Sequence, residues 1–253
     1  MANPSGGRLA MLSRRATLRA AALTRWVPAQ ELPPTGLAAV LYRAGGCAPK
    51  RGTDPQWPQL LLRRAETGVR QRLTGYQWAA TEGWASWTAA EAHVADLVHK
   101  VYVSPAVTGL ARALPVVFES ATARRVPAWK VGSDLPSVHR PDKIVLYLGD
   151  ADEADRAAAA LADALATLPA QGVPFTWQVG DSGIVSRGLD RDATSWRAVV
   201  CQLLSDALWQ ARDELGDGAP DREVGRAALE RLAEAGFDVD DWSPRAPATS
   251  TVP

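Results

Sequence analysis

The sequence predicts an α+β fold, in which helices flank a central, mostly antiparallel sheet and a helical region precedes that sheet. Two observations support this prediction. Four short runs are rich in β-branched and aromatic residues, and five longer segments have the composition and spacing of helices. The expected strands cover residues 97–103, 126–131, 143–148 and 173–179, and the expected helices cover 59–73, 106–121, 152–168, 193–215 and 221–235.

Local signals justify the elements in order along the chain. The segment 59–73 places apolar residues at helical spacing opposite an arginine-rich face. The run 97–103 alternates and ends at a Ser-Pro pair, and 143–148 is strongly apolar. The segment 152–168 begins with acidic residues, which the helix dipole favours at an N-terminus. A Gly-Asp-Ser-Gly turn follows the run 173–179.

These elements divide the chain into four parts. We expect a disordered basic arm at 1–15, a helical N-terminal region at 16–94, an α/β body at 95–242 and a disordered Pro/Ala/Thr-rich tail at 243–253. The arm and the residues just after it contain arginines and no acid, and Arg14-Arg15 is similar to a twin-arginine export signal. The apolar stretch of such a signal is interrupted at Thr24-Arg25, so we expect a cytoplasmic protein.

Composition excludes several classes of partner. The 253 residues carry a formal net charge of zero, so no overall field would attract nucleic acid or a membrane surface. No run approaches the ~20 apolar residues of a membrane span. Cys47 and Cys201 match no zinc or redox spacing, and we expect both as reduced thiols. Any attraction for a phosphorylated substrate must therefore come from a local cluster of cations.

The familiar catalytic motifs are missing. The sequence has neither a P-loop nor a strand–GxGxxG–helix unit, and it has no GxSxG nucleophile elbow. Its three histidines, at 93, 99 and 139, are not at metal-binding spacing. We therefore expect neither a metal nor an organic cofactor.

Basic residues near the ends of the expected strands are the remaining candidates for chemistry. They are Lys100, Lys130, Arg140, Lys143 and Arg187. Each alone fits a lysine or arginine that extends from a strand to solvent, but five such cations near strand ends also suit a phosphate. Arginine binds phosphate with a planar fork, and a desolvated lysine can act as a base. β-Elimination of a phosphate monoester needs such a base and such cations.

Two pairs of motifs resemble known families. HKVYVSP at 99–105 and AWKVG at 128–132 resemble the paired motifs of the phosphothreonine-lyase domains in class III and IV lanthionine synthetases. HRPDKIVLYL at 139–148 and the stretch 171–197 look like the HopA-type effector-like family, which accompanies separate kinases in class V lanthipeptide and thioamitide gene clusters. The resemblance covers about residues 95–212. It implies a lyase that eliminates phosphate from phosphorylated Ser or Thr of a precursor peptide and leaves dehydroalanine or dehydrobutyrine.

The resemblance also implies roles for individual residues. Lys130 matches the lysine that takes the Cα proton, and Lys100 matches a lysine that contacts phosphate. The general-acid histidine of the family falls at Tyr102, a weaker acid at neutral pH. Tyr102 or a histidine such as His139 or His99 could serve as the acid, or the phosphate could leave unaided. Arg140 and Arg187 are the expected phosphate clamps, with Lys143 as a further cation.

Two other functions fit the same residues. The arginine-rich segment 59–73 and the three tryptophans at 78, 84 and 87 suit a peptide-binding surface. For the tryptophans we favour packing over peptide binding, because a tryptophan most often buries its ring. The chain could then be a catalytically weak subunit that binds a precursor peptide and docks it to a partner kinase. A type III effector-like toxin acting on host proteins is the third possibility.

Overall fold

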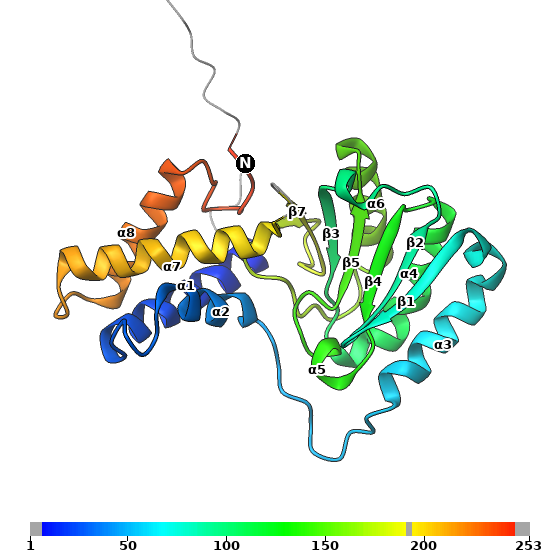
Figure 1. Ribbon diagram of the computed structural model, residues 1–253, viewed down its shortest axis with the longest axis horizontal. Helices are drawn as coiled ribbons and strands as arrows, with labels where there is room; N and C mark the ends of the chain where they lie inside the picture. The colour runs from blue at the N-terminus through cyan, green and yellow to red at the C-terminus, as the bar shows by residue number, and fades with distance from the viewer. Residues whose placement is uncertain (1–6, 191–193, 246–253) are drawn as a thin grey trace, which may run out of the picture.

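The computed structural model describes residues 7–190 and 194–245 and has the expected α+β architecture (Figure 1). One seven-stranded sheet has the strand order β1-β2-β4-β5-β3-β7-β6, and every neighbouring pair is antiparallel. The strands are β1 (Tyr76–Thr81), β2 (Trp84–Ala89), β3 (His99–Val103), β4 (Ala128–Gly132), β5 (Ile144–Leu148), β6 (Trp177–Val179) and β7 (Val185–Leu189).

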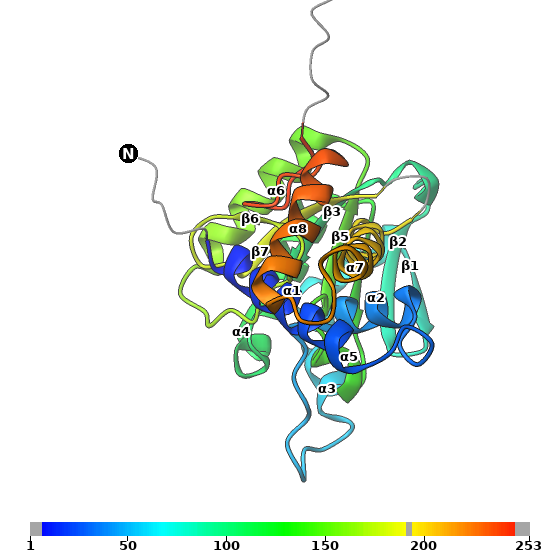
Figure 2. The same ribbon diagram turned by 90° about the vertical axis from the view of Figure 1, so that its left-hand side faces the viewer.

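One group of helices packs on a face of the sheet, and a second group contacts β6 and β7. The first group packs on the sheet: α3 (Trp57–Val69), α4 (Leu110–Ala123) and α6 (Ala151–Ala164). The second forms a separate bundle: α1 (Arg8–Trp26), α2 (Pro34–Arg43), α7 (Trp196–Leu215) and α8 (Asp221–Glu234). Figure 2 shows these four helices gathered in front of the sheet. The short α5 (Leu135–Val138) connects β4 to β5.

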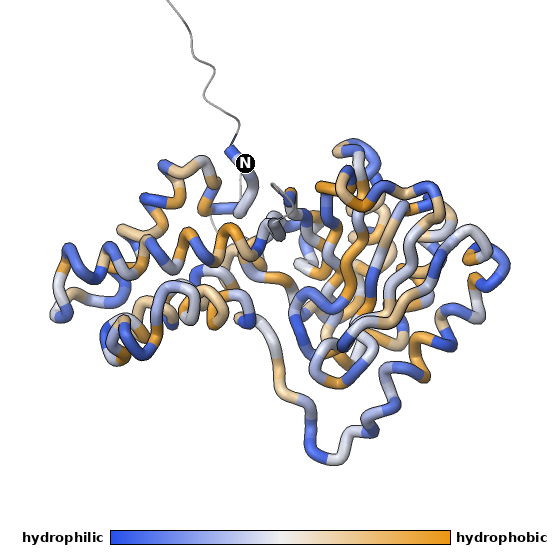
Figure 3. Tube along the Cα trace, in the orientation of Figure 1, coloured by the Kyte–Doolittle hydropathy of each residue, from blue (hydrophilic) through white to orange (hydrophobic). Residues whose placement is uncertain are grey.

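Each group of helices has its own hydrophobic core. The larger core joins α3, α4 and α6 to one face of the sheet, where the rings of Trp87 and Trp129 stack at 5.7 Å and Phe118 meets both edge-on. The second core lies within the four-helix bundle and includes Trp196 and Trp242. In Figure 3 the strands in the middle of the sheet carry long hydrophobic stretches. The face of the sheet that packs on α4 and α6 is called the helix-packed face below.

The expected domain boundaries need three corrections. Helix α1 begins at Arg8, so residues 8–15 of the expected arm at 1–15 are helical. Leu9 and Ala10 in this part of the helix are buried. The expected helical region at 16–94 ends in a β-hairpin, β1–β2. Its two-residue turn has Gly83 at φ +74°, a conformation that favours glycine. Residues 243–245 of the expected tail are ordered, because Pro244 forms a β-bridge with Phe237. Residues 1–6 and 246–253 lie outside the described residues.

The expected strands and helices are mostly confirmed, with shifts at their ends. Strand β6 is shorter than expected, because only Trp177–Val179 of the run 173–179 pairs with β7. Strand β7 itself was not expected. Helix α6 begins as its acidic start indicated, with the Asp150 side chain accepting a hydrogen bond of 2.8 Å from the Glu153 amide. No helix among the described residues is long and apolar enough to cross a membrane.

Candidate active site

Three neighbouring strands bring two of the candidate lysines onto one face of the sheet. On β3 and β5, Lys100 is opposite Tyr147 and Tyr102 is opposite Val145. On β4, Lys130 is also opposite Val145. Because side chains directly opposite each other in a sheet point to the same side, all of these residues share one face. We call it the lysine face; it carries both Lys100 and Lys130.

Lys130 lies among aromatic rings, where its amine is largely buried. Its Nζ is 4.4 Å from the centre of the Trp84 ring and 5.7 Å from that of Tyr147. Burial lowers the pKa of Lys130, and repulsion by Lys100 lowers it further. A lysine with a lowered pKa has a larger neutral fraction at physiological pH, and only the neutral amine can accept a proton.

Lys100 keeps a close counter-ion. Its Nζ is 2.5 Å from a carboxylate oxygen of Asp190, and it is also 5.2 Å from the centre of the Tyr147 ring. The other Asp190 oxygen accepts a hydrogen bond of 2.9 Å from the Trp196 amide, at the start of α7. The Asp190 carboxylate therefore links the Lys100 ammonium group to the first turn of α7, a helix of the bundle.

Arg140 belongs to a network around a buried carboxylate. Its Nε and Nη2 donate to the two oxygens of Asp142 at 2.9 and 3.0 Å. The fully buried Arg197 reaches Asp142 at 3.1 Å, and the Tyr42 hydroxyl donates to it at 3.2 Å. Burial alone would raise the pKa of Asp142, but Arg197 and Arg140 hold it well below its usual range. Asp142 is therefore an anion that fixes the position of Arg140.

The network meets the lysines at one indole ring. The guanidinium carbon of Arg140 is 5.2 Å from the centre of the Trp84 ring, the same ring that Lys130 approaches at 4.4 Å. The Arg140 side chain is 41% exposed, so it can still reach a ligand. Among the described residues, two carboxylates, those of Asp142 and Asp190, pair with Lys100, Arg140 and Arg197. The group keeps an excess of one positive charge when Lys130 is neutral and of two when it is protonated, which suits an anion such as phosphate.

A cavity lies beside Arg140. It has a volume of about 710 Å³ and opens between α2, α5 and the start of α7. Tyr42, Arg140 and Asp142 line it, together with His139. Arg140 and Asp142 thus lie both at this cavity and in the network beside Trp84.

Tyr102 does not have the properties of a general acid. Its side chain is 2% exposed, and its hydroxyl has no hydrogen-bond partner among the described residues. Burial raises the pKa of Tyr102 well above its usual value. A buried hydroxyl that holds its proton this tightly is poorly placed to protonate a leaving phosphate, so Tyr102 packs under the site.

His139 and Lys143 follow α5, and hydrogen bonds to neighbouring segments hold both side chains. The Nδ1 of His139 is 2.7 Å from the Leu135 carbonyl oxygen, so this nitrogen donates a hydrogen bond. Lys143 is fully buried, and its Nζ donates to the Pro105 carbonyl at 3.1 Å and to the Gln171 side chain at 2.7 Å. Burial lowers the pKa of Lys143 to about 7. The expectation that Lys143 contacts phosphate is wrong for this structure, because no ligand can reach a fully buried amine.

Arg187 lies on the helix-packed face and does not join the cluster. In the register of β3 and β7 it is opposite Val101, whereas Lys100 is opposite Gly188. Its guanidinium pairs with Asp155 of α6 and lies 3.3 Å from His99 Nδ1. The expectation that Arg187 clamps the same phosphate is therefore wrong, because a shift of one residue along a strand moves a side chain to the opposite face.

The comparisons with known proteins concern the fold. No protein-family model matches the chain, and no curated protein matches its sequence significantly. The chain is similar to the effector protein from Pseudomonas syringae pv. tomato strain DC3000, with a TM-score of 0.56 at 11% identity over 95% of this chain and 100% of that one. The effector protein from Pseudomonas syringae pv. syringae strain 61 gives 0.54 at 13% identity, with the same coverage. Identities this low show a common fold and leave the chemistry open.

A third solved structure is similar over a smaller part. The type III effector/phosphothreonine lyase OspF from Shigella flexneri matches 51% of this chain and 88% of its own, at 13% identity. The TM-score is 0.39, too low to support an argument about this chain. The evidence for a catalytic function therefore comes from the residues of the lysine face.

Sequence reasoning missed several residues of this site. They are Tyr42, Asp142, Tyr147, Asp190 and Arg197, and for Trp84 it missed the role beside Lys130. Asp142 had one usable signal, since it stands two residues after Arg140 in a loop before a strand. Tyr42 and Arg197 come from the helical bundle, far from the strands in sequence, and only the folded chain brings them to the site.

Proposed function

We propose that this protein is a phospho-Ser/Thr lyase, which eliminates phosphate from a phosphorylated peptide and leaves a dehydroamino acid. One observation carries the proposal: Lys130, whose pKa is lowered, shares a face of the sheet with Lys100 and an indole ring with Arg140. A base and two phosphate-binding cations next to each other are the groups that this elimination needs.

The proposed step uses Lys130 as the base. Its neutral Nζ takes the Cα proton of the phosphorylated residue, and the electron pair of that C–H bond forms the Cα=Cβ double bond. The Cβ–O bond breaks, and its electron pair leaves with the phosphate. The products are a dehydroalanine or dehydrobutyrine residue, inorganic phosphate and a protonated lysine, which returns its proton to water.

Lys100 and Arg140 stabilise the charge that develops on the leaving phosphate. Arg140 offers the N–H groups that Asp142 leaves free, and Lys100 supplies a point charge that Asp190 orients. Asp142, held by the buried Arg197, fixes the Arg140 guanidinium before substrate binds. Such cations are most effective when they need no rearrangement during the reaction.

The substrate must arrive phosphorylated, so a kinase must act before this enzyme. We propose a ribosomally made precursor peptide as the substrate and a separate kinase as a partner; both proposals rest on the sequence motifs at 99–105, 128–132 and 139–148. We further propose that the protein acts in the cytoplasm, where such a peptide is made.

Mass spectrometry of a synthetic phosphothreonine peptide incubated with the protein tests the activity. A lyase removes the elements of phosphoric acid, and the product reacts with an added thiol. A phosphatase would return the threonine peptide, which is heavier than the elimination product by one water and does not add a thiol. A peptide that stays phosphorylated throughout would contradict the proposal.

A further inference from the structure

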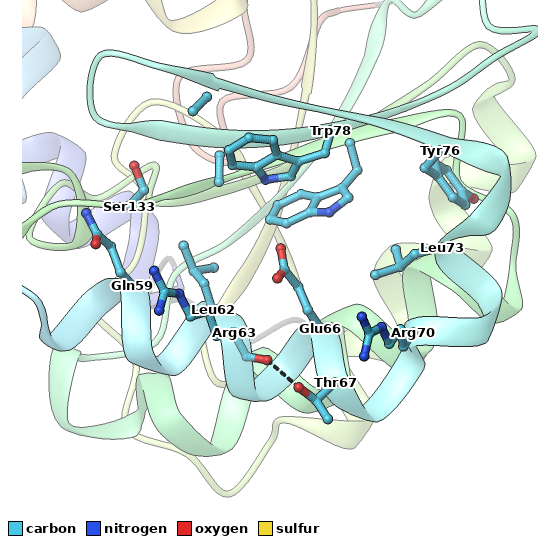
Figure 4. Close-up of a pocket in the computed structure, with 13 residues that line it drawn as sticks. Gln59, Leu62, Arg63, Glu66, Thr67, Arg70, Leu73, Tyr76, Trp78 and Ser133 are labelled. Atoms are coloured by element: carbon cyan, nitrogen blue, oxygen red, sulfur yellow. Dashed lines mark hydrogen bonds between the residues drawn. The ribbon is translucent and has the colours of Figure 1, made fainter.

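A second cavity lies on the other side of the sheet, between α3 and the β1–β2 hairpin. Its volume is about 790 Å³. In Figure 4 the α3 side chains rise from the helix, and Trp78 hangs toward them from the hairpin. We call this cavity the α3 groove. None of its lining residues belongs to the site on the lysine face.

The hairpin side of the α3 groove is aromatic. Trp78 and Trp87 are directly opposite each other in the register of β1 and β2 and point into the groove. Trp87 is 2% exposed and packs in the core, but Trp78 is 59% exposed. Trp78 therefore offers an accessible indole ring inside the groove. The suggestion that these tryptophans only pack is thus correct for Trp87 and wrong for Trp78.

The helix side of the α3 groove is cationic. Arg63 and Arg70 line it, and neither makes an ion pair within the part of the chain that the structure describes. The segment from α3 through the following 3₁₀ helix, residues 57–75, carries four arginines and a single acid, Glu66. Glu66 lies between Arg63 and Arg70 along the groove, and burial raises its pKa. The groove therefore has an excess of positive charge next to an apolar wall.

We propose that the α3 groove binds an acidic segment of the polypeptide substrate, outside the phosphorylated residue, through Trp78, Arg63 and Arg70. This inference rests on the proposed function for the identity of the bound chain. Carboxylates of the segment pair with the two arginines, and its apolar side chains cover Trp78. β1 is the last strand of the sheet, so its outer edge also offers free main-chain groups to an extended peptide.

The position of the α3 groove sets the spacing that such a substrate needs. Trp87 points into the groove, whereas its neighbour Ser86 is opposite Lys130 on the lysine face. Lys130 is on β4, two strands from β1, and neighbouring strands are about 5 Å apart. Passing around the edge of the sheet adds about 10 Å, the distance between packed layers. A path of about 20 Å needs at least about six extended residues between the bound segment and the phosphorylated residue.

The binding test uses an unphosphorylated probe, a fluorescein-labelled synthetic peptide of Asp, Glu, Leu and Phe, followed by fluorescence anisotropy. We expect the acidic probe to bind and a Lys-substituted counterpart not to bind. The variants Trp78→Ala and Arg63→Glu/Arg70→Glu should each weaken binding by at least about tenfold. Glu66→Gln should strengthen it about threefold, because it removes a negative charge from the groove.

Matched control variants exist on α1. Trp26 is 74% exposed, and the Arg25 guanidinium lies 5.0 Å from its ring centre. Trp26→Ala and Arg25→Glu therefore remove similar exposed groups elsewhere and should leave the binding of the probe unchanged. All of these side chains are partly or fully exposed, and circular dichroism would confirm that each variant is folded.

Equal binding of acidic and basic probes, or equal affinity of wild type and Trp78→Ala, would overturn the docking proposal. The two proposals fail separately. Elimination from a short phosphothreonine peptide that lacks an acidic segment tests the lyase site alone, and we expect Trp78→Ala to match wild type there. With longer peptides, Trp78→Ala should raise KM and leave kcat unchanged, provided that the acidic segment lies at least about six residues from the phosphothreonine.

Discussion

The Nζ of Lys130 lies 4.4 Å from the centre of the Trp84 ring, on the neighbouring strand. The indole shields the amine from water, which disfavours the positive charge, but the face of the ring attracts a cation. The pKa of Lys130 is lowered, so burial is the larger of the two effects. The amine therefore combines a reduced affinity for its proton with a fixed position beside Arg140. These properties suit a general base, and they lead to the first prediction.

Lys130→Arg should still bind a phosphopeptide but lose elimination by a factor of roughly 100 or more. Arginine keeps the positive charge and most of the bulk but does not deprotonate in proteins. Single-turnover assays and phosphopeptide binding would measure the two effects separately. Lys50→Arg, on an exposed loop, is the matched control and should behave as wild type. Elimination by Lys130→Arg at a rate close to wild type would show that another group takes the proton.

Lys100→Ala should weaken phosphopeptide binding as well as turnover, because it removes a phosphate contact. It should also move the pH profile. Lys100 lowers the pKa of Lys130, so its removal raises that pKa. Because the neutral amine is the active form, the rate rises with pH through the pKa of Lys130. The rising limb for Lys100→Ala should therefore lie at higher pH than for wild type. An unshifted limb would mean that the two lysines are not coupled.

Tyr102→Phe should leave elimination within about threefold of wild type. The hydroxyl it removes is buried and has no hydrogen-bond partner among the described residues, so the variant should be as stable as wild type or more stable by about 1 kcal/mol. Single-turnover rates and urea unfolding would test both statements. A loss of 100-fold or more would restore Tyr102 as the general acid that the motif at 99–105 implied.

Local patterns were enough to predict much of the sheet but not its whole composition. The strands around Lys100 and Lys130 were recognisable because each is a compact run of β-branched and aromatic residues. The β1–β2 hairpin was missed, because its many alanines and exposed residues give little hydrophobic contrast. Strand β7 was missed for a similar reason, since its central residues are Ser186, Arg187 and Gly188.

The site was only partly predictable, because it depends on register and on distant segments. The alternation along β3 predicted that Lys100 and Val101 lie on opposite faces of the sheet. No local pattern gives the register of β7 against β3, and this register puts Arg187 on the helix-packed face. Arg197 could not be predicted as a site residue from the sequence, for another reason. It belongs to a helix of the bundle, and its charge matters only because the fold buries it against Asp142.

Lys143→Met should change how stability depends on pH. The pKa of Lys143 is about 7 in the folded protein, whereas that of an ordinary, exposed lysine is 10.5. Between about pH 10.5 and pH 7 the unfolded chain binds a proton that the folded chain does not, so wild-type stability falls as pH decreases through this window. The variant lacks this group, and other titrations cancel in the comparison. Urea unfolding at several pH values should show wild type losing stability relative to Lys143→Met as pH falls from 10 to 7. Parallel curves would contradict the prediction.

Asp142→Asn should reduce both stability and activity. The substitution leaves the fully buried Arg197 without its counter-charge, which typically costs about 3–5 kcal/mol. It also releases Arg140, whose two hydrogen bonds to Asp142 fix its guanidinium, so turnover should fall even under conditions where the variant is folded.

Because the pKa of Asp142 is lowered, its stabilising effect is complete above about pH 4, the usual range for an unfolded Asp, and is lost as pH falls below that. Urea unfolding of wild type and Asp142→Asn should therefore converge at acidic pH and differ at neutral pH. Asp240→Asn, which removes an exposed carboxylate paired with Arg14, is the control and should cost less than about 1 kcal/mol at any pH. A cost for Asp142→Asn as small as that of this control would mean that Asp142 neither holds Arg140 nor neutralises Arg197.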